Sequence, residues 1–107
     1  MNFELDKNIH ERARLLIMVA LATSPDKKLS FNELKDITKL SSGNLSVQIK
    51  NLEDVGYVEV RKFFENSKPK TEVVITDRGK RSLEEYLDTI ENIIKLYKGG
   101  EYESDSA

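Results

Sequence analysis

Apolar residues recur along much of the chain at spacings typical of amphipathic helices. In the middle of the chain Leu45, Ile49 and Leu52 recur at i, i+4 and i+7, which predicts a short helix with one buried stripe. Ser41 stands where an N-cap belongs, and Gly56 stands where a helix ends in the left-handed conformation. The pattern therefore predicts a helix between Ser41 and Gly56.

The other arc of this predicted helix lacks the usual run of Glu and Lys. It carries small or polar residues, one basic residue and little bulk: Gly43, Asn44, Ser46, Val47, Lys50 and Asn51. Such a face suits close approach to another surface, and the DNA major groove admits a helix whose first turns meet base edges. A solvated helix of a small α-bundle is the alternative that this segment alone leaves open.

The first predicted helix precedes this segment. Asn8 and Glu11 form a candidate capping box for a helix that runs to about Thr23. Its run 15–22 is apolar on every face, and a helix that is hydrophobic all round is expected to be buried all round. In so small a domain the second covering surface is expected to come from a partner subunit.

A second, short helix is predicted between these two. Residues 30–33 form a capping box, and the helix is expected to end between residues 36 and 38, with a buried stripe at Phe31, Leu34 and Ile37. Leu29, just before it, is a candidate residue for a short strand. About three residues then lead to Ser41, so the two helices are a helix-turn-helix candidate, with a generic αα-hairpin as the alternative.

After Gly56 the hydrophobic period changes to about two. The segments 57–64 and 71–76 are rich in β-branched and aromatic residues, and the polar segment 65–70 between them predicts a turn. A hairpin directly after a helix-turn-helix is the order of a winged helix. Lys68 and Lys70 at its tip are placed to meet phosphates, although lysines also protect exposed hairpins from aggregation.

A long last helix is predicted from Asp77 to about Lys98, with Thr76 as its cap. Its apolar stripe consists of Leu83, Leu87, Ile90 and Ile94, widened by Tyr86, Ile93 and Tyr97. At 1.5 Å per residue it is about 30 Å long, too long for a small body to cover its whole apolar face. We therefore expect residues 90–97 to contact a second copy, with packing back onto the first helix as an alternative that is compatible with it. We also expect residues 1–98 to form one domain and residues 99–107 to form a disordered acidic tail.

Composition narrows the chemistry. The chain has 107 residues, no cysteine and one histidine, His10, which excludes disulfides, thiolate metal sites and a histidine-rich metal site within one protomer. The net charge is -2, but residues 61–81 carry +4 and residues 82–107 carry -5. This asymmetry favours an anionic partner at one end of the molecule.

Two other classes fit poorly. Arg12 and Arg14 precede the apolar run and Ala20-Leu21-Ala22 resembles a signal-peptidase site, but acidic residues offset the arginines and the run is short, so a buried helix is favoured. The run is also too short to span a bilayer, so no membrane association is expected. A catalytic set would have to use His10, and no glycine-rich phosphate loop is present, so the sequence predicts no enzyme and no cofactor.

Four segments in order carry a family resemblance: IHERARLLIM, FNELKDITKLSSGNLSVQIKNLEDVGYVEVRKFF, KPKTEVVITDRGK and LEEYL. Over residues 5–96 the chain resembles the single-domain winged-helix regulators related to the MarR and ArsR groups. The resemblance implies an α+β, mostly α fold with a three-helix core, a two-stranded β-hairpin wing and a long C-terminal helix. It also implies a cytoplasmic regulator that binds double-stranded DNA as a homodimer, with residues 42–52 in the major groove and 62–71 on the backbone.

These expectations define candidate sites. The predicted DNA-binding residues are Ser41, Ser42, Gly43, Asn44, Ser46, Val47, Lys50, Lys62, Lys68 and Lys70, and the predicted dimer residues are Leu15, Val19, Leu87, Ile90, Ile94 and Tyr97. The reading helix has no arginine, so the commonest specific contact, arginine to guanine, is missing from it. For Arg14 the position before the apolar run suggests a structural ion pair, with a backbone contact as the alternative.

A winged helix used only for protein contact is the alternative function. The sequence also leaves open whether an effector exists. Tyr86 and Tyr97 are the candidate lining of a dimer cleft for an apolar ligand.

Overall fold

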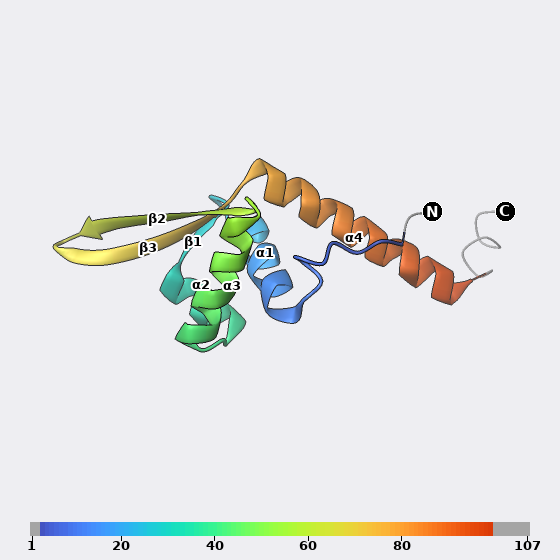
Figure 1. Cartoon of the computed structure of the whole chain (residues 1–107), viewed down its shortest axis with the longest axis horizontal. Helices are drawn as coiled ribbons and strands as arrows, with labels where there is room; N and C mark the ends of the chain where they lie inside the picture. The colour runs from blue at the N-terminus through green and yellow to red at the C-terminus, as the bar shows by residue number, and fades with distance from the viewer. Residues whose placement is uncertain (1–2, 100–107) are drawn as a thin grey trace.

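The computed structural model describes residues 3–99. Its elements are α1 (Arg12–Thr23), β1 (Lys28–Ser30), α2 (Phe31–Thr38), α3 (Ser42–Asp54), β2 (Val58–Glu65), β3 (Lys68–Ile75) and α4 (Asp77–Lys98). Helices α1, α2 and α3 form a body from which the β2–β3 hairpin extends on one side and α4 on the other (Figure 1). The winged-helix fold predicted from the sequence is confirmed, while residues 100–107 of the predicted tail lie outside the described residues.

The sheet has three antiparallel strands in the order β1-β3-β2. Leu29, the candidate strand residue, lies in β1 opposite Val73. The sheet is therefore one short strand larger than the two-stranded wing that the resemblance implied. Because β1 pairs only with residues 72–74, the distal half of the hairpin stands free of it.

The hairpin is longer than the sequence pattern predicted. Residues 65 and 68–70, assigned to the turn, belong to the strands, and only Asn66 and Ser67 form the turn. Both have positive φ, 52° and 64°, as a two-residue type I′ turn requires. Pro69 lies opposite Phe64, beyond the end of β1, where a missing N–H interrupts no further strand pairing.

The core lies where α1, α2, α3 and the base of the sheet meet. The side chains with the least exposed surface are Ile9, Ile17, Met18, Leu21, Leu34, Leu45, Leu52 and Val73. Ile37, predicted to be buried, is 56% exposed. Helix α2 has only eight residues and buries Leu34 and Thr38, one turn apart, so Ile37 faces outward.

The predicted cap of α1 was wrong in detail. The N-cap is Glu11, whose carboxylate accepts the N–H of Ala13 at 2.6 Å, whereas Asn8 lies in the preceding turn. There Asn8 donates its N–H to Asp6 and its carbonyl oxygen accepts from Arg14. Leu16 is 37% exposed in the single chain, which leaves open the prediction that a partner subunit covers this side of the helix.

The start of α4 is locked to the end of α3. The hydroxyl of Thr76 accepts the N–H of Gly79 and donates to the carbonyl oxygen of Gly56 at 2.6 Å. A Cβ on Gly79 would lie 2.2 Å from the carbonyl oxygen of Tyr57, so only glycine fits this contact. The junction therefore fixes the direction in which α4 leaves the body.

Candidate nucleic-acid interface

Helix α3 begins and ends as its sequence predicted. The hydroxyl of Ser41 accepts the N–H of Asn44 at 3.1 Å, and Gly56 has a φ of +81°. At the C-terminus the N–H of Tyr57 reaches the carbonyl oxygen of Leu52, which closes a Schellman-type end. The predicted stripe of Leu45, Ile49 and Leu52 is buried.

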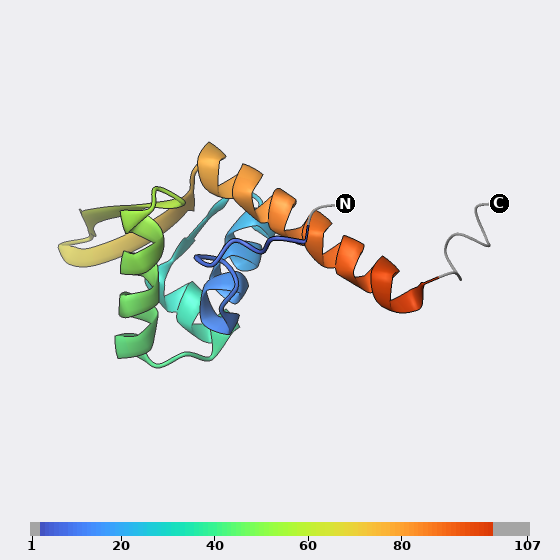
Figure 2. The same cartoon turned by 45° about the vertical axis from the view of Figure 1, so that its right-hand side comes forward.

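The opposite arc of α3 is uncovered. Every residue predicted to lie on it is exposed: Gly43, Asn44, Ser46, Val47, Lys50 and Asn51. Val47 is 57% exposed, an apolar side chain presented to solvent on an otherwise polar face. Figure 2 shows α3 along one side of the body, next to the hairpin and away from the far end of α4.

Gln48 is a residue of this site that the sequence analysis missed. Its amide nitrogen donates to Asn44 Oδ1 at 3.0 Å, and its Oε1 accepts from Arg14 Nη1 at 2.7 Å. Arg14 also lies 3.5 Å from Glu11, which confirms the predicted ion pair. The i, i+4 spacing of Asn44 and Gln48 signalled their contact, but nothing in the sequence placed Arg14 beside α3.

Lys50 is less free than the sequence suggested. Its ammonium group donates to Asp54 at 2.6 Å across one helical turn. That hydrogen bond, followed by the charge of Asp54, raises the pKa of Lys50, so the side chain stays protonated at neutral pH. The pair is exposed, and a phosphate could replace the carboxylate at little cost.

A groove of about 360 Å³ separates α3 from the base of the hairpin. Its lining comes from α2, α3, β2 and β3: Phe31, Ser46, Ile49, Lys50, Glu53, Val60, Lys62 and Thr71. The fold therefore places three of the predicted DNA-binding residues, Ser46, Lys50 and Lys62, around one hollow.

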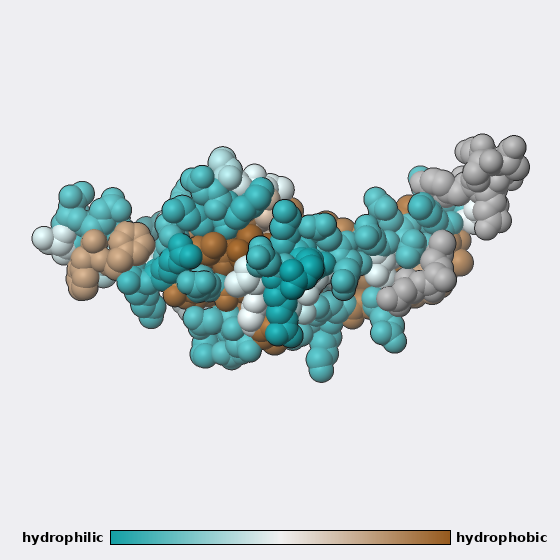
Figure 3. All heavy atoms as spheres, turned by 90° about the horizontal axis from the view of Figure 1, so that it is seen from above, coloured by the Kyte–Doolittle hydropathy of each residue, from teal (hydrophilic) through white to brown (hydrophobic). Residues whose placement is uncertain are grey.

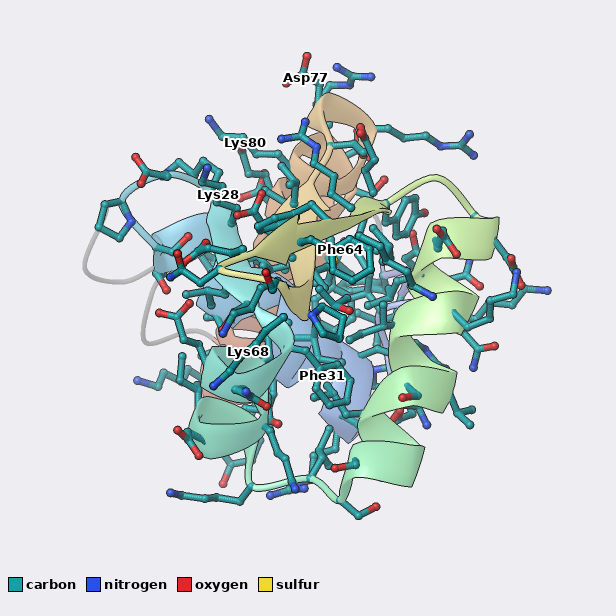
Figure 4. All side chains as sticks on the ribbon, turned by 90° about the vertical axis from the view of Figure 1, so that its left-hand side faces the viewer. Lys28, Phe31, Phe64, Lys68, Asp77 and Lys80 are labelled. Carbon is teal, nitrogen blue, oxygen red and sulfur yellow. The ribbon has the colours of Figure 1, made fainter. Side chains whose placement is uncertain are left out.

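Lys68 and Lys70, the two lysines at the hairpin tip, lie on the face of the hairpin opposite to Lys62. Side chains alternate along a strand, so Lys62 shares one face with Phe64, while Lys68 and Lys70 share the opposite face. All three lysines are exposed, and Figure 4, which looks at the hairpin end, shows Lys68 and Phe64 projecting from the strands. The wing thus carries basic groups on both faces.

The base of the wing is closer to neutral than its basic count predicted. Arg61 lies 3.2 Å from Glu59 and 3.9 Å from Glu72, and Lys28 lies 3.7 Å from Glu72. These pairs occupy the face that also carries the tip lysines. Within the hairpin, the basic residues outside these ion pairs are therefore Lys62, Lys68 and Lys70.

The wing also exposes two aromatic residues that were not predicted as site residues. Phe64 is 78% exposed and Phe63 is 40% exposed. Figure 3 shows an apolar area at the hairpin end, separate from the apolar residues of the body. As neighbours on one strand, Phe63 and Phe64 point to opposite faces of the hairpin. The run Lys62-Phe63-Phe64 was a sequence signal for such a surface, but it was interpreted only as a strand.

The predicted dimer residues divide into two groups. Leu15, Val19 and Ile90 are half-buried against the core, whereas Leu87, Ile94 and Tyr97 are exposed. Leu96, which was not predicted, is 64% exposed in the same stretch. Figures 1 and 2 show the second half of α4 extending past the body, as its length predicted.

Of the two tyrosines suggested to line a dimer cleft for an effector, Tyr86 is buried within the chain and is not available for that role. Tyr86 is 4% exposed and its hydroxyl is hydrogen-bonded to His10 Nδ1 at 2.8 Å. Tyr97, in contrast, is 89% exposed three turns further along α4. Tyr86 therefore belongs to the core.

Within residues 3–99 no cluster of His, Asp and Glu side chains could hold a metal ion. No helix in that same range combines the length and the apolar character needed to cross a membrane.

The helix-turn-helix formed by α2 and α3, followed by the β2–β3 hairpin, makes this protein a winged helix. One face of α3, the second helix of the helix-turn-helix, is uncovered. The chain belongs to the family described as the winged helix DNA-binding domain, which it matches over residues 13–94. Its fold is that of the MarR-like transcriptional regulators.

Two similar solved structures and one similar sequence illustrate the match. A transcriptional regulator homologue from Pyrococcus horikoshii OT3 superimposes with a TM-score of 0.77 at 30% identity, over 84% of this chain and 87% of that chain. Sco3205, a MarR family regulator from Streptomyces coelicolor solved in complex with DNA, gives a TM-score of 0.68 at 22% identity, over 85% of this chain and 60% of that chain. The uncharacterized protein MJ0432 of Methanocaldococcus jannaschii is 35% identical over 65 residues, which are 61% of this chain and 71% of the relative.

Proposed function

We propose that this chain is a cytoplasmic, non-enzymatic transcriptional regulator that binds double-stranded DNA as a homodimer. Helix α3 enters the major groove and the hairpin 62–71 lies along a flanking stretch of backbone. The observation that carries the proposal is the uncovered face of α3, which has no acidic residue between Ser41 and Asn51 and adjoins Lys62 across one groove.

Each predicted residue has a role in this arrangement. The N-terminus of α3, with Ser41, Ser42 and Gly43, offers N–H groups and a positive dipole end to a phosphate. Asn44 and Ser46 meet base edges, and Val47 packs against a thymine methyl group. Lys62, Lys68 and Lys70 contact phosphates, which position the protein without reading sequence, and Lys50 exchanges Asp54 for a base or a phosphate.

A second copy completes this site. Two α3 helices related by a two-fold axis meet successive turns of a duplex only when the subunits are joined. The exposed apolar residues at the far end of α4, Ile94, Leu96 and Tyr97, are the surface through which we propose that the subunits pair.

The test is fluorescence anisotropy of a labelled random-sequence duplex at several salt concentrations. Neutralising about six phosphates gives a slope of about -5 in log K against log salt concentration. The variants Lys68→Glu and Lys70→Glu each weaken binding, whereas Lys7→Glu, which changes the charge equally at an exposed position before α1, does not.

Two observations favour a second candidate function, a winged helix that contacts another protein. The single basic residue of the reading arc is paired with Asp54, and the wing exposes Phe64. On this account no duplex is bound at low salt and a Phe64→Ser variant loses the protein partner. The salt titration thus separates the two functions.

A further inference from the structure

The contact between Arg14, Gln48 and Asn44 has a direction that the chemistry of the three groups imposes. An arginine side chain has only donors, so the Gln48 atom that lies 2.7 Å from Arg14 Nη1 must be the amide oxygen. The Gln48 amide nitrogen then faces Asn44 and needs an acceptor, which is Asn44 Oδ1 at 3.0 Å. The orientation of both amides therefore follows from the position of Arg14.

Arg14 is itself held in place. Its Nε donates to the carbonyl oxygen of Asn8 at 2.6 Å, Nη1 lies 3.5 Å from Glu11, and the side chain is only 18% exposed. An anchored donor on α1 therefore determines the orientation of a side chain on the exposed face of α3.

We call the contacts from Arg14 through Gln48 to Asn44 the relay. The relay leaves the amide nitrogen of Asn44 facing outward. Asn44 is exposed, and within residues 3–99 its Nδ2 has no hydrogen-bond partner. It lies in the first turn of α3, the part of a reading helix that meets base edges.

We propose that Arg14 and Gln48 are positioning residues that set the base preference of Asn44, a proposal that rests on the proposed DNA-binding function. With its oxygen held by Gln48, Asn44 meets the base through a donor. In the major groove guanine presents only acceptors, N7 and O6, whereas cytosine presents only a donor, N4. The relay therefore favours guanine over cytosine at the base that Asn44 contacts.

The variant Gln48→Glu tests the direction of the relay. A glutamate still pairs with Arg14, but its second oxygen also accepts, so the Asn44 amide must turn and donate its Nδ2 to it. Asn44 Oδ1 then faces outward and meets a donor. The variant is expected to prefer cytosine over guanine, reversing a preference of about 5-fold, the value of one hydrogen bond.

The experiment is selection from a randomised duplex library followed by sequencing, with wild type, Asn44→Ala and Gln48→Glu. The position at which Asn44→Ala loses its preference identifies the contacted base pair. Gln48→Met, which removes the relay without adding charge, relaxes the preference at that position. Asn32→Asp, which adds one negative charge at an exposed position of helix α2, leaves the guanine preference in place.

A Gln48→Glu variant that keeps the guanine preference would overturn the proposal, as would a wild type that prefers cytosine there. Failure to bind any duplex at low salt would instead overturn the proposed function. In that case NMR of the side-chain amides still tests whether the relay exists. In Arg14→Met with an otherwise unchanged backbone spectrum, the Gln48 and Asn44 amide signals both shift, and unchanged signals would show that no relay exists.

Discussion

Helices α3 and α4 each leave one face uncovered, and the two faces differ in chemistry. The uncovered arc of α3 carries glycine, asparagine, serine and lysine around a single apolar residue, Val47. The far end of α4 instead exposes Leu87, Ile94, Leu96 and Tyr97. A polar face with small side chains is suited to a hydrated, charged surface such as DNA. An apolar face is stabilised only when another apolar surface covers it and removes it from water.

The two helices also begin in the same way but are held differently. Ser41 and Thr76 are both N-caps, yet only the start of α4 is packed against backbone, through Gly79 and Tyr57. The start of α3 is open, since a Cβ on Gly43 would meet nothing within 4 Å. The body therefore fixes the origin of α4 while it presents the first turn of α3 to solvent.

The largest effect is expected from charging the apolar end of α4. In a symmetric dimer the double variant Ile94→Glu, Tyr97→Glu replaces four apolar side chains, and we expect the dimer dissociation constant to rise about 1,000-fold. Analytical ultracentrifugation measures the change. Lys95→Glu, which alters the net charge by the same two units in the same turn, leaves the dimer intact, and a wild type that is monomeric at every concentration would refute the pairing surface.

The next effect separates the two helical glycines. Gly79→Ala places a methyl group 2.2 Å from the carbonyl oxygen of Tyr57 and is expected to lower the free energy of unfolding by about 3 kcal/mol. Gly43→Ala in α3 meets open space and is expected to raise it by about 0.5 to 1 kcal/mol, because alanine restricts the unfolded chain. Urea denaturation followed by circular dichroism gives both values, and equal effects would contradict the difference.

A smaller effect is expected at the start of α3. Ser41→Ala removes the acceptor for the N–H of Asn44 and should cost about 1 kcal/mol of stability. Ser42→Ala, one residue further on, replaces an exposed side chain that caps no helix and should leave thermal unfolding unchanged. If both substitutions lowered the melting temperature equally, the cap would not be the cause.

The smallest effect is expected in the stability of the fold at high pH, through Tyr57 at the α3–α4 junction. Burial, followed by the hydrogen bond with Asp6, raises the pKa of Tyr57 above its ordinary value of 10.0. The folded state therefore favours the neutral phenol, so this contribution is complete below about pH 10 and is lost as the pH rises through the raised pKa. Stability of the wild type should fall more steeply above pH 10 than that of Tyr57→Phe, and parallel curves would contradict this.

The predictions that the structure confirms concern features set by residues close together in the sequence. The capping box at 30–33 and the caps Ser41 and Thr76 are confirmed, as are the buried stripe of α3 and the left-handed Gly56. Each is a local pattern in which one side chain satisfies a backbone group a few positions away, so the pattern can be recognised without the fold.

The features that the sequence analysis predicted wrongly or missed have other causes. They depend on two residues suited to one role, on a turn without its usual residue, or on contacts between residues far apart in the chain. Asn8 and Glu11 both suited the cap of α1, and Glu11 holds it while the carbonyl oxygen of Asn8 accepts from Arg14. The turn at Asn66 has no glycine to mark its positive φ, so the hairpin was predicted too short. The contact between Arg14 and Gln48 joins residues 34 positions apart, and only the packing of α1 on α3 creates it.

The most direct test of the account asks what each uncovered face meets. The chain has no cysteine, so Ser46→Cys on α3 and Tyr97→Cys on α4 can each carry one photo-crosslinker. With a duplex present at low salt, the account predicts protein–DNA adducts from position 46 and protein–protein adducts from position 97. DNA adducts from position 97 with none from position 46 would contradict it.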